Sequence, residues 1–132
     1  MGVFIKEGNG MTFNEAIENL MENIKKNYFV WTSPNRVEGN MRDIKLESID
    51  RFNDSIKFTR GRKYTKIMQG SSVWGFVANG NGVMKGIPYK QGDVFMAATW
   101  RGPAKHVRGN IFAKKQNYFR WTGPDYIWRG KG

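Results

Sequence analysis

The side chains with the clearest potential for binding chemistry are cations in the second half of the chain, where Lys and Arg alternate with aromatic residues. Four Arg-Gly dipeptides begin there, at Arg60, Arg101, Arg108 and Arg129. A guanidinium presents a planar fork that binds two phosphate oxygens or stacks on a base, and glycine lets backbone come close to a phosphate. We therefore predict a polyanion-binding surface formed by ten residues: Arg60, Arg62, Lys63, Lys66, Trp100, Arg101, Lys105, Arg108, Lys114 and Lys115.

Aromatic rings are the second part of this pattern. Proteins that bind single strands combine a cationic groove along the backbone with ring faces under the bases. A domain of this size needs most of its rings in the core, so we expect one or two to be exposed, with Trp100 as the first candidate. We also expect the segment from Trp100 to Arg108 to be a loop in which Arg101, Lys105, His106 and Arg108 face solvent.

The sequence offers little for catalysis. His106 is the only histidine and there is no cysteine, so neither a zinc site nor a Cys/His dyad is indicated. Asp93 and Asp125 lie in turn-forming contexts. Gly80-Asn81-Gly82 leads into a turn, whereas a phosphate-cradling loop leads into a helix. We predict a non-enzymatic protein without a metal or other cofactor.

Charge is divided unevenly along the chain. Residues 1–54 carry seven Lys/Arg and nine Asp/Glu, a net charge of −2, whereas residues 55–132 carry fifteen Lys/Arg and two Asp, a net charge of +13. Such a concentrated positive potential attracts nucleic acid, an acidic protein or an anionic membrane face. A solvated basic surface without a ligand is the alternative.

Length and composition set the remaining bounds. The 132 residues predict a single domain, 1–132, with a mildly acidic part at 1–54 that bears a helix and a basic, β-rich part at 55–132. No apolar run approaches the roughly 18 residues needed to span a bilayer, and the first residues lack a secretory signal. Together with the absence of cysteine, this predicts a cytoplasmic protein without a membrane partner.

The first expected element is a helix from about Thr12 to Lys26, begun by a Thr-x-x-Glu capping box at Thr12 and Glu15. Its apolar positions follow helical spacing. A short extended run from Tyr28 to Trp31 follows and stops at the turn Ser33-Pro34-Asn35. We interpret residues 36–54 as a strand, although Met41, Ile44 and Phe52 also fit one face of a helix.

From Ser55 onward the apolar pattern has a period of two, typical of strands. Hairpin turns are predicted at 69–71 and 79–82, and another turn at 90–93 launches a strand over 94–98. The last strands are expected at 111–112, 118–122 and 126–128. The predicted fold is α+β: one N-terminal amphipathic helix packed on a bent antiparallel sheet or a small β-barrel of OB or SH3-like size.

One internal echo links the two ends of the chain. Residues 25–35, from Lys25-Lys26 to Pro34-Asn35, return with one insertion as residues 114–125. Two such aromatic strands, each ending in a proline turn, would pair about a local pseudo-symmetry axis. Convergence on the same turn chemistry explains the echo equally well.

Short motifs over residues 63–128 resemble a small module found in uncharacterised proteins of tailed bacteriophages: Gly92-Asp93-Val94, Pro103-Ala104, Arg108-Gly109-Asn110-Ile111-Phe112 and Trp121-Thr122-Gly123-Pro124. The resemblance leaves the N-terminal helix outside. It implies expression in the cytoplasm of an infected bacterium and carries no activity or site residues.

The sequence thus favours a nucleic-acid-binding protein for DNA or RNA that prefers single strands, because aromatic residues accompany the charge. One alternative is a phage-encoded effector that binds an acidic surface of a host protein. A further alternative is a virion or assembly component.

Overall fold

The first helix begins where the capping residues predict. The computed structural model describes residues 11–113 and 120–124, and within them α1 spans Phe13–Thr32. The Glu15 amide donates to Thr12 Oγ1 over 3.2 Å, and the Thr12 amide donates to Glu15 Oε1 over 2.9 Å. This reciprocal pair satisfies two amides that the first turn leaves without helical partners. The predicted capping box is confirmed.

The helix continues past its predicted end, and the extended run expected from Tyr28 to Trp31 is helical. The helix stops at Ser33, whose φ of 54° is left-handed, and Pro34 follows in the 3-10 helix η1, Pro34–Arg36. Tyr28 explains the extension, because its ring stacks on Phe52 at 4.2 Å between centroids. The aromatic run therefore serves helix packing, and its prediction as a strand was wrong.

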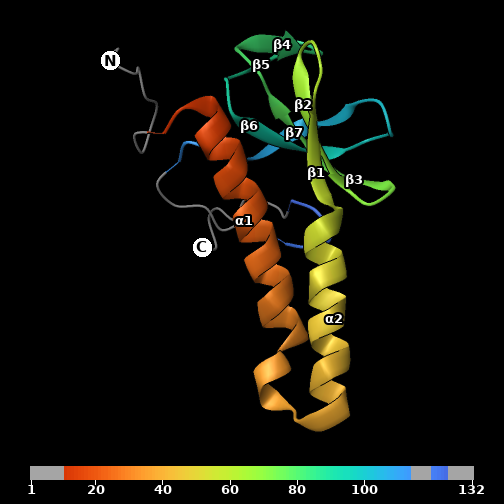
Figure 1. Ribbon diagram of the computed structural model, residues 1–132. Helices are drawn as coiled ribbons and strands as arrows, with labels where there is room; N and C mark the ends of the chain where they lie inside the picture. The colour runs from red at the N-terminus through yellow and green to blue at the C-terminus, as the bar shows by residue number, and fades with distance from the viewer. Residues whose placement is uncertain (1–10, 114–119, 125–132) are drawn as a thin grey trace, which may run out of the picture.

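A second helix, α2, spans Gly39–Ser55, where a strand was predicted for 36–54. It lies antiparallel beside α1 and leads directly into the sheet (Figure 1). Only Ile49 and Phe52 of α2 are buried, while Met41 and Ile44 are exposed. With two buried positions the helical period is weak, so the chance alternation of Ile44 and Leu46 misled the prediction.

Seven strands follow in the described part of the chain, all paired antiparallel as predicted. Five form one sheet in the order β1-β2-β3-β6-β7, and two form a separate hairpin. Within the described residues the sheet is open, with β1 and β7 at its edges, so the bent sheet and not the closed barrel is found. The strands are β1 Ile56–Arg60, β2 Tyr64–Gln69, β3 Ser72–Ala78, β4 Gly82–Met84, β5 Ile87–Tyr89, β6 Asp93–Ala97 and β7 Pro103–Asn110.

The predicted turns at 69–71 and 90–93 are confirmed, with Gly70 and Gly92 at positive φ. The segment 79–82, predicted as a hairpin turn, instead connects β3 to β4, and the hairpin turns at Lys85-Gly86. The loop predicted from Trp100 to Arg108 is wrong from residue 103 onward, because Pro103–Asn110 form β7. Pro103 occupies its first position, where a missing amide donor costs least.

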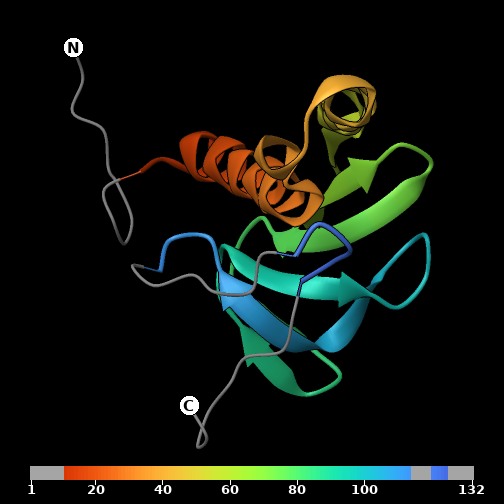
Figure 2. The same ribbon diagram turned by 90° about the horizontal axis from the view of Figure 1, so that it is seen from below.

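The two faces of the sheet differ. Figure 2 shows both helices on one side and the β4–β5 hairpin on the other. Between helices and sheet lies the main core, which includes Leu20, Ile24, Ile67, Trp74 and Val94. A smaller aromatic cluster lies on the opposite side. We call these sides the helix face and the open face.

The strands predicted for the C-terminal end of the chain are absent from the part of it that the structure describes. Residues 111–112 and 120–122 form turns or irregular structure, and the expected strand at 126–128 lies outside the described residues. The two copies of the echo nevertheless meet: the Trp121 amide donates to Asn27 Oδ1 over 2.9 Å, and the Trp31 and Trp121 rings lie 4.9 Å apart. Because the first copy is helical, the predicted strand pairing is wrong.

Among the described helices, none has the length and apolar character that crossing a bilayer requires.

Candidate nucleic-acid interface

A single row of side chains crosses the open face and sets the position of the site. The strand registers place Thr59 opposite Lys66, Lys66 opposite Phe76, Phe76 opposite Phe95, and Phe95 opposite Val107. Residues directly opposite on neighbouring strands point to the same face. Lys66 therefore lies between Thr59 and Phe76 on β2, an interior strand of the sheet.

A groove of about 420 Å³ lies over one end of this row. It joins the ends of β1 and β2 to the tip of the β6–β7 hairpin. Arg62, Lys63, Lys66 and Arg101 supply four of the cations predicted from the sequence. The full lining is Thr59, Gly61, Arg62, Lys63, Tyr64, Lys66, Phe76 and Arg101.

Trp100 joins the site through Lys66. The Lys66 ammonium lies 4.3 Å from the centre of the Trp100 ring and 5.9 Å from that of Phe76. The hairpin tip is braced, because the Arg101 and Gly102 amides both donate to Thr99 Oγ1. Trp100 remains 52% exposed, which agrees with its choice as the first candidate for an exposed ring.

The groove concentrates positive charge without an acid in its lining. Within the described ranges, no carboxylate lies in ion-pair distance of Arg62, Lys63, Lys66 or Arg101. Like charges gathered on low-dielectric walls focus a field that attracts anions. The arrangement suits a ligand that carries several negative charges.

The floor of the groove contains a neutral phenol. The pKa of Tyr64 is raised to about 12, chiefly by partial burial and then by its hydrogen bond to Tyr89 and by electrostatic repulsion between the two phenol oxygens. Tyr64 therefore stays protonated at physiological pH and offers an O–H group without adding a negative charge to the cationic groove.

Two predicted site residues lie on the helix face. Arg60 pairs with Thr65, which is buried toward the helices, and its guanidinium lies 4.9 Å from the centre of the Phe13 ring of α1. Arg108 was expected to face solvent, but it is only 9% exposed. That expectation was wrong because residues 103–110 form a strand, in which side chains alternate between faces.

The Arg108 guanidinium holds the chain after the sheet. Its Nη1 donates to the Pro124 carbonyl over 3.3 Å, and its Nη2 lies 3.4 Å from Met96 Sδ. Gly75 makes room for the same segment, since a Cβ there would lie 3.2 Å from Pro124 Cγ and 2.7 Å from the Phe95 carbonyl oxygen. Arg108 thus has a structural role in the described part of the molecule.

The remaining predicted residues lie elsewhere. Lys105 is exposed on β7, as is His106, but neither lines the groove. Lys114 and Lys115 lie outside the described residues. Four residues of the lining were not among the predicted site residues: Thr59, Gly61, Tyr64 and Phe76. The turn at Gly70 would not have found Phe76, because a β-bulge between Ile67 and Met68 shifts the register. Counting outward from that turn pairs Lys66 with Gly75, whereas the structure pairs Lys66 with Phe76.

The described residues contain no group of three or more His, Asp or Glu side chains that could hold a metal ion.

The fold and the groove define a two-layer α+β protein with two helices on one face of an open antiparallel sheet and a basic, aromatic groove on the other. The chain belongs to DUF7717, a family of unknown function whose model matches residues 7–129. The match includes both helices as well as the sheet. The comparisons with curated proteins and with solved structures gave no significant match.

Proposed function

We propose that this protein binds nucleic acid without catalysing a reaction, and that the groove on the open face holds a single strand. The observation that carries the proposal is the Lys66 ammonium 4.3 Å from the centre of the exposed Trp100 ring, inside a group of four cations without an acid. Recognition of single-stranded nucleic acid combines two components: cations along its phosphate backbone and aromatic rings that stack on its bases.

The groups in the groove suit binding. Arg62, Lys63 and Arg101 are exposed and reach phosphates from the rim, and each contact releases counterions from the strand. Lys66 lies over Trp100, and the exposed part of the ring is available to a base. Guanidinium, ammonium and phenol groups line the groove, with no nucleophile beside a general base, which favours binding without chemistry.

The proposal is tested by fluorescence anisotropy with labelled single-stranded oligonucleotides. We expect Arg101→Ala to weaken binding about tenfold, or about 1.4 kcal/mol, because it removes a phosphate contact at the rim. Arg51→Ala is the matched control, since Arg51 is also an exposed arginine and lies on α2, away from the groove. Equal effects of the two substitutions would show that binding follows net charge alone.

Two further arms identify the type of ligand. Trp100→Ala should weaken single-strand binding by about 1–3 kcal/mol and change duplex binding much less, because duplex bases are already stacked. A salt titration should give a log–log slope of about −3, as expected for four contacts at about 0.7 each on a single strand. Failure of the wild type to bind any DNA or RNA at low salt would overturn the proposal.

A protein partner is the second candidate function. The end of the helix pair distant from the sheet exposes Val30, Trp31, Met41 and Ile44, with Trp31 64% exposed. Exposed apolar side chains gathered on one part of a surface are typical of protein–protein contacts. In this alternative, the protein is an effector that binds an acidic host protein through the distal end of the helix pair together with the basic groove. Its test is affinity capture from a bacterial lysate, in which Trp31→Ala should release the partner.

A further inference from the structure

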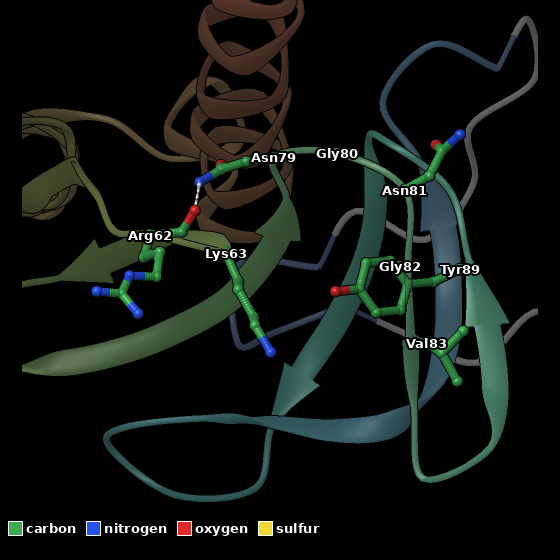
Figure 3. Close-up of a pocket in the computed structure, with 8 residues that line it drawn as sticks. All are labelled: Arg62, Lys63, Asn79, Gly80, Asn81, Gly82, Val83 and Tyr89. Carbon is green, nitrogen blue, oxygen red and sulfur yellow. Dashed lines mark hydrogen bonds between the residues drawn. The ribbon is translucent and has the colours of Figure 1, made fainter.

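A second hollow lies on the other side of the turn that carries Arg62 and Lys63. It has a volume of about 270 Å³, and Figure 3 shows the eight residues that line it. Arg62 and Lys63 belong to the lining of both this hollow and the groove. The other lining residues are Asn79, Gly80, Asn81, Gly82, Val83 and Tyr89, and the lining contains no carboxylate.

The wall that bears the two cations is fixed by Asn79. Its Nδ2 donates to the carbonyl oxygen of Gly61 over 2.9 Å and to that of Arg62 over 3.3 Å; the bond to Arg62 is the dashed line in Figure 3. Its backbone amide donates to the Lys63 carbonyl over 2.9 Å. Its Oδ1 accepts from Thr65 Oγ1 over 2.6 Å. Asn79 therefore ties the cationic turn to the end of β3.

The opposite wall is held by hydrogen bonds between the β3–β4 connection and Gln91, in the turn before β6. Asn81 Oδ1 accepts from the Gln91 amide over 2.8 Å, and Gln91 Nε2 donates to the Asn79 carbonyl over 3.1 Å. Tyr89 is only 8% exposed and lies against Gly82, where any Cβ would collide with the phenol oxygen. In Figure 3 the Tyr89 hydroxyl points across the hollow toward the side of Lys63.

The groove and the hollow share their floor as well as their rim. The Tyr64 ring lines the groove, the Tyr89 ring lines the hollow, and the two ring centres are 5.8 Å apart. The two depressions therefore lie back to back on a tyrosine pair and meet at Arg62 and Lys63.

The chemistry of the two depressions differs. The groove has the exposed indole of Trp100 at its edge, whereas the hollow has no exposed aromatic ring: Tyr89 is buried and Val83 is its exposed apolar residue. Ammonium, guanidinium and phenol donors without a stacking surface suit a phosphate and its sugar better than a base.

We propose that a single strand bound in the groove continues across Arg62 and Lys63 into this hollow, where Lys63 and Tyr89 hold a backbone phosphate. The inference rests on the proposed function and extends it. The hollow then acts as a second subsite that recognises sugar and phosphate and ignores base identity. It raises affinity only for strands long enough to reach it.

The experiment compares oligo(dT) strands of increasing length on the full chain with Asn81→Asp. Aspartate retains the oxygen that accepts from the Gln91 amide, so the wall stays intact while the hollow gains a negative charge. We expect about a tenfold loss of affinity for long strands and little change for the shortest strands that bind. The salt slope for long strands should fall by about 0.7, the value of one phosphate contact.

Asn40→Asp is the matched control, because it adds the same charge at an exposed position on α2. Circular dichroism checks that both variants fold. Equal effects of Asn81→Asp and Asn40→Asp at every length would overturn the second subsite, while a selective loss in Arg101→Ala would still support the proposed function.

Two other outcomes would also overturn the inference. If inorganic phosphate or a thymidine mononucleotide binds the hollow with the affinity of a long strand, the hollow is a small-anion site and not part of a track. If the wild type binds no oligonucleotide, both the proposed function and its second subsite are wrong.

Discussion

The helix face and the open face of the sheet use the same residue types in opposite ways. Trp74, on the helix face, is 2% exposed and donates from Nε1 to the Arg120 carbonyl over 2.6 Å. Trp100, over the open face, is half exposed and contacts a lysine. Arg108 is buried against Pro124, whereas Arg101 is exposed at the rim of the groove.

The comparison shows that residue type alone does not identify a binding residue in a β protein. Which face a side chain occupies depends on its position along the strand, since successive residues point in opposite directions. Thr65 and Lys66 are neighbours in sequence, yet one is buried with the helices and the other lies in the groove. The helix face should therefore govern stability, and the open face should govern binding.

The largest expected effect is on the helix face. Leu20 of α1 is fully buried, so Leu20→Ala removes packed methyl groups and leaves a cavity, with an expected loss of about 2–5 kcal/mol in the free energy of unfolding. Urea denaturation followed by circular dichroism measures it. The control is Ile44→Ala on exposed α2, for which we expect a change within about 0.5 kcal/mol. A loss of stability for Leu20→Ala as small as that for Ile44→Ala would contradict the packing of Leu20 in the core.

An intermediate effect separates the two arginines. Arg108→Ala removes the charged hydrogen bond that holds the Pro124 carbonyl, so we expect a loss of about 1.5–3 kcal/mol in the free energy of unfolding. Arg101→Ala, at the exposed hairpin tip, should change stability by less than about 0.5 kcal/mol. Thermal unfolding of both variants, together with their oligonucleotide affinities, checks the division. A stable Arg108→Ala variant that loses oligonucleotide binding would contradict it.

The sequence was sufficient to predict the α+β class, the capped first helix and the antiparallel sheet, because these depend on local signals such as Thr12 with Glu15 and the turn at Gly70. It was insufficient for α2. Ser48 and Phe52 of that helix contact Tyr28 of α1, and no local pattern records a contact between segments that are distant in sequence.

The sequence predicted only part of the candidate site, because local patterns do not record which distant segments meet. Composition indicated Arg62, Lys63, Lys66 and Arg101, which the structure brings together in one groove. It could not separate them from Arg60 and Arg108, because only the strand boundaries and registers assign those two arginines to the helix face. A strand at 103–110 that begins with proline resembles a loop until its partner β6 is known.

The smallest expected effect concerns half-buried Tyr64, which packs against buried Tyr89 under the open face. The pKa of Tyr64 is raised from its ordinary value of 10.0 to about 12, chiefly by burial. The folded protein therefore holds this proton more tightly than the unfolded chain does. The stabilisation is fully present below about pH 10 and is lost as the pH rises toward 12, because the unfolded chain ionises first.

Tyr64→Phe removes this ionisation, so we expect its stability to fall less steeply than that of the wild type as the pH rises above about 10. At neutral pH the variant should be slightly less stable, because the hydrogen bond with Tyr89 is lost. Urea denaturation across the alkaline range measures both effects. Tyr28→Phe is the control: it removes a phenol on the helix face and its contact with Ser48, and it should keep the steeper alkaline loss because Tyr64 is still present. If the free energy of unfolding falls equally steeply with pH in the wild type and in Tyr64→Phe, the packing of the open face does not raise the pKa of Tyr64. The floor shared by the groove and the hollow would then be more accessible to water than the packing of the two rings indicates.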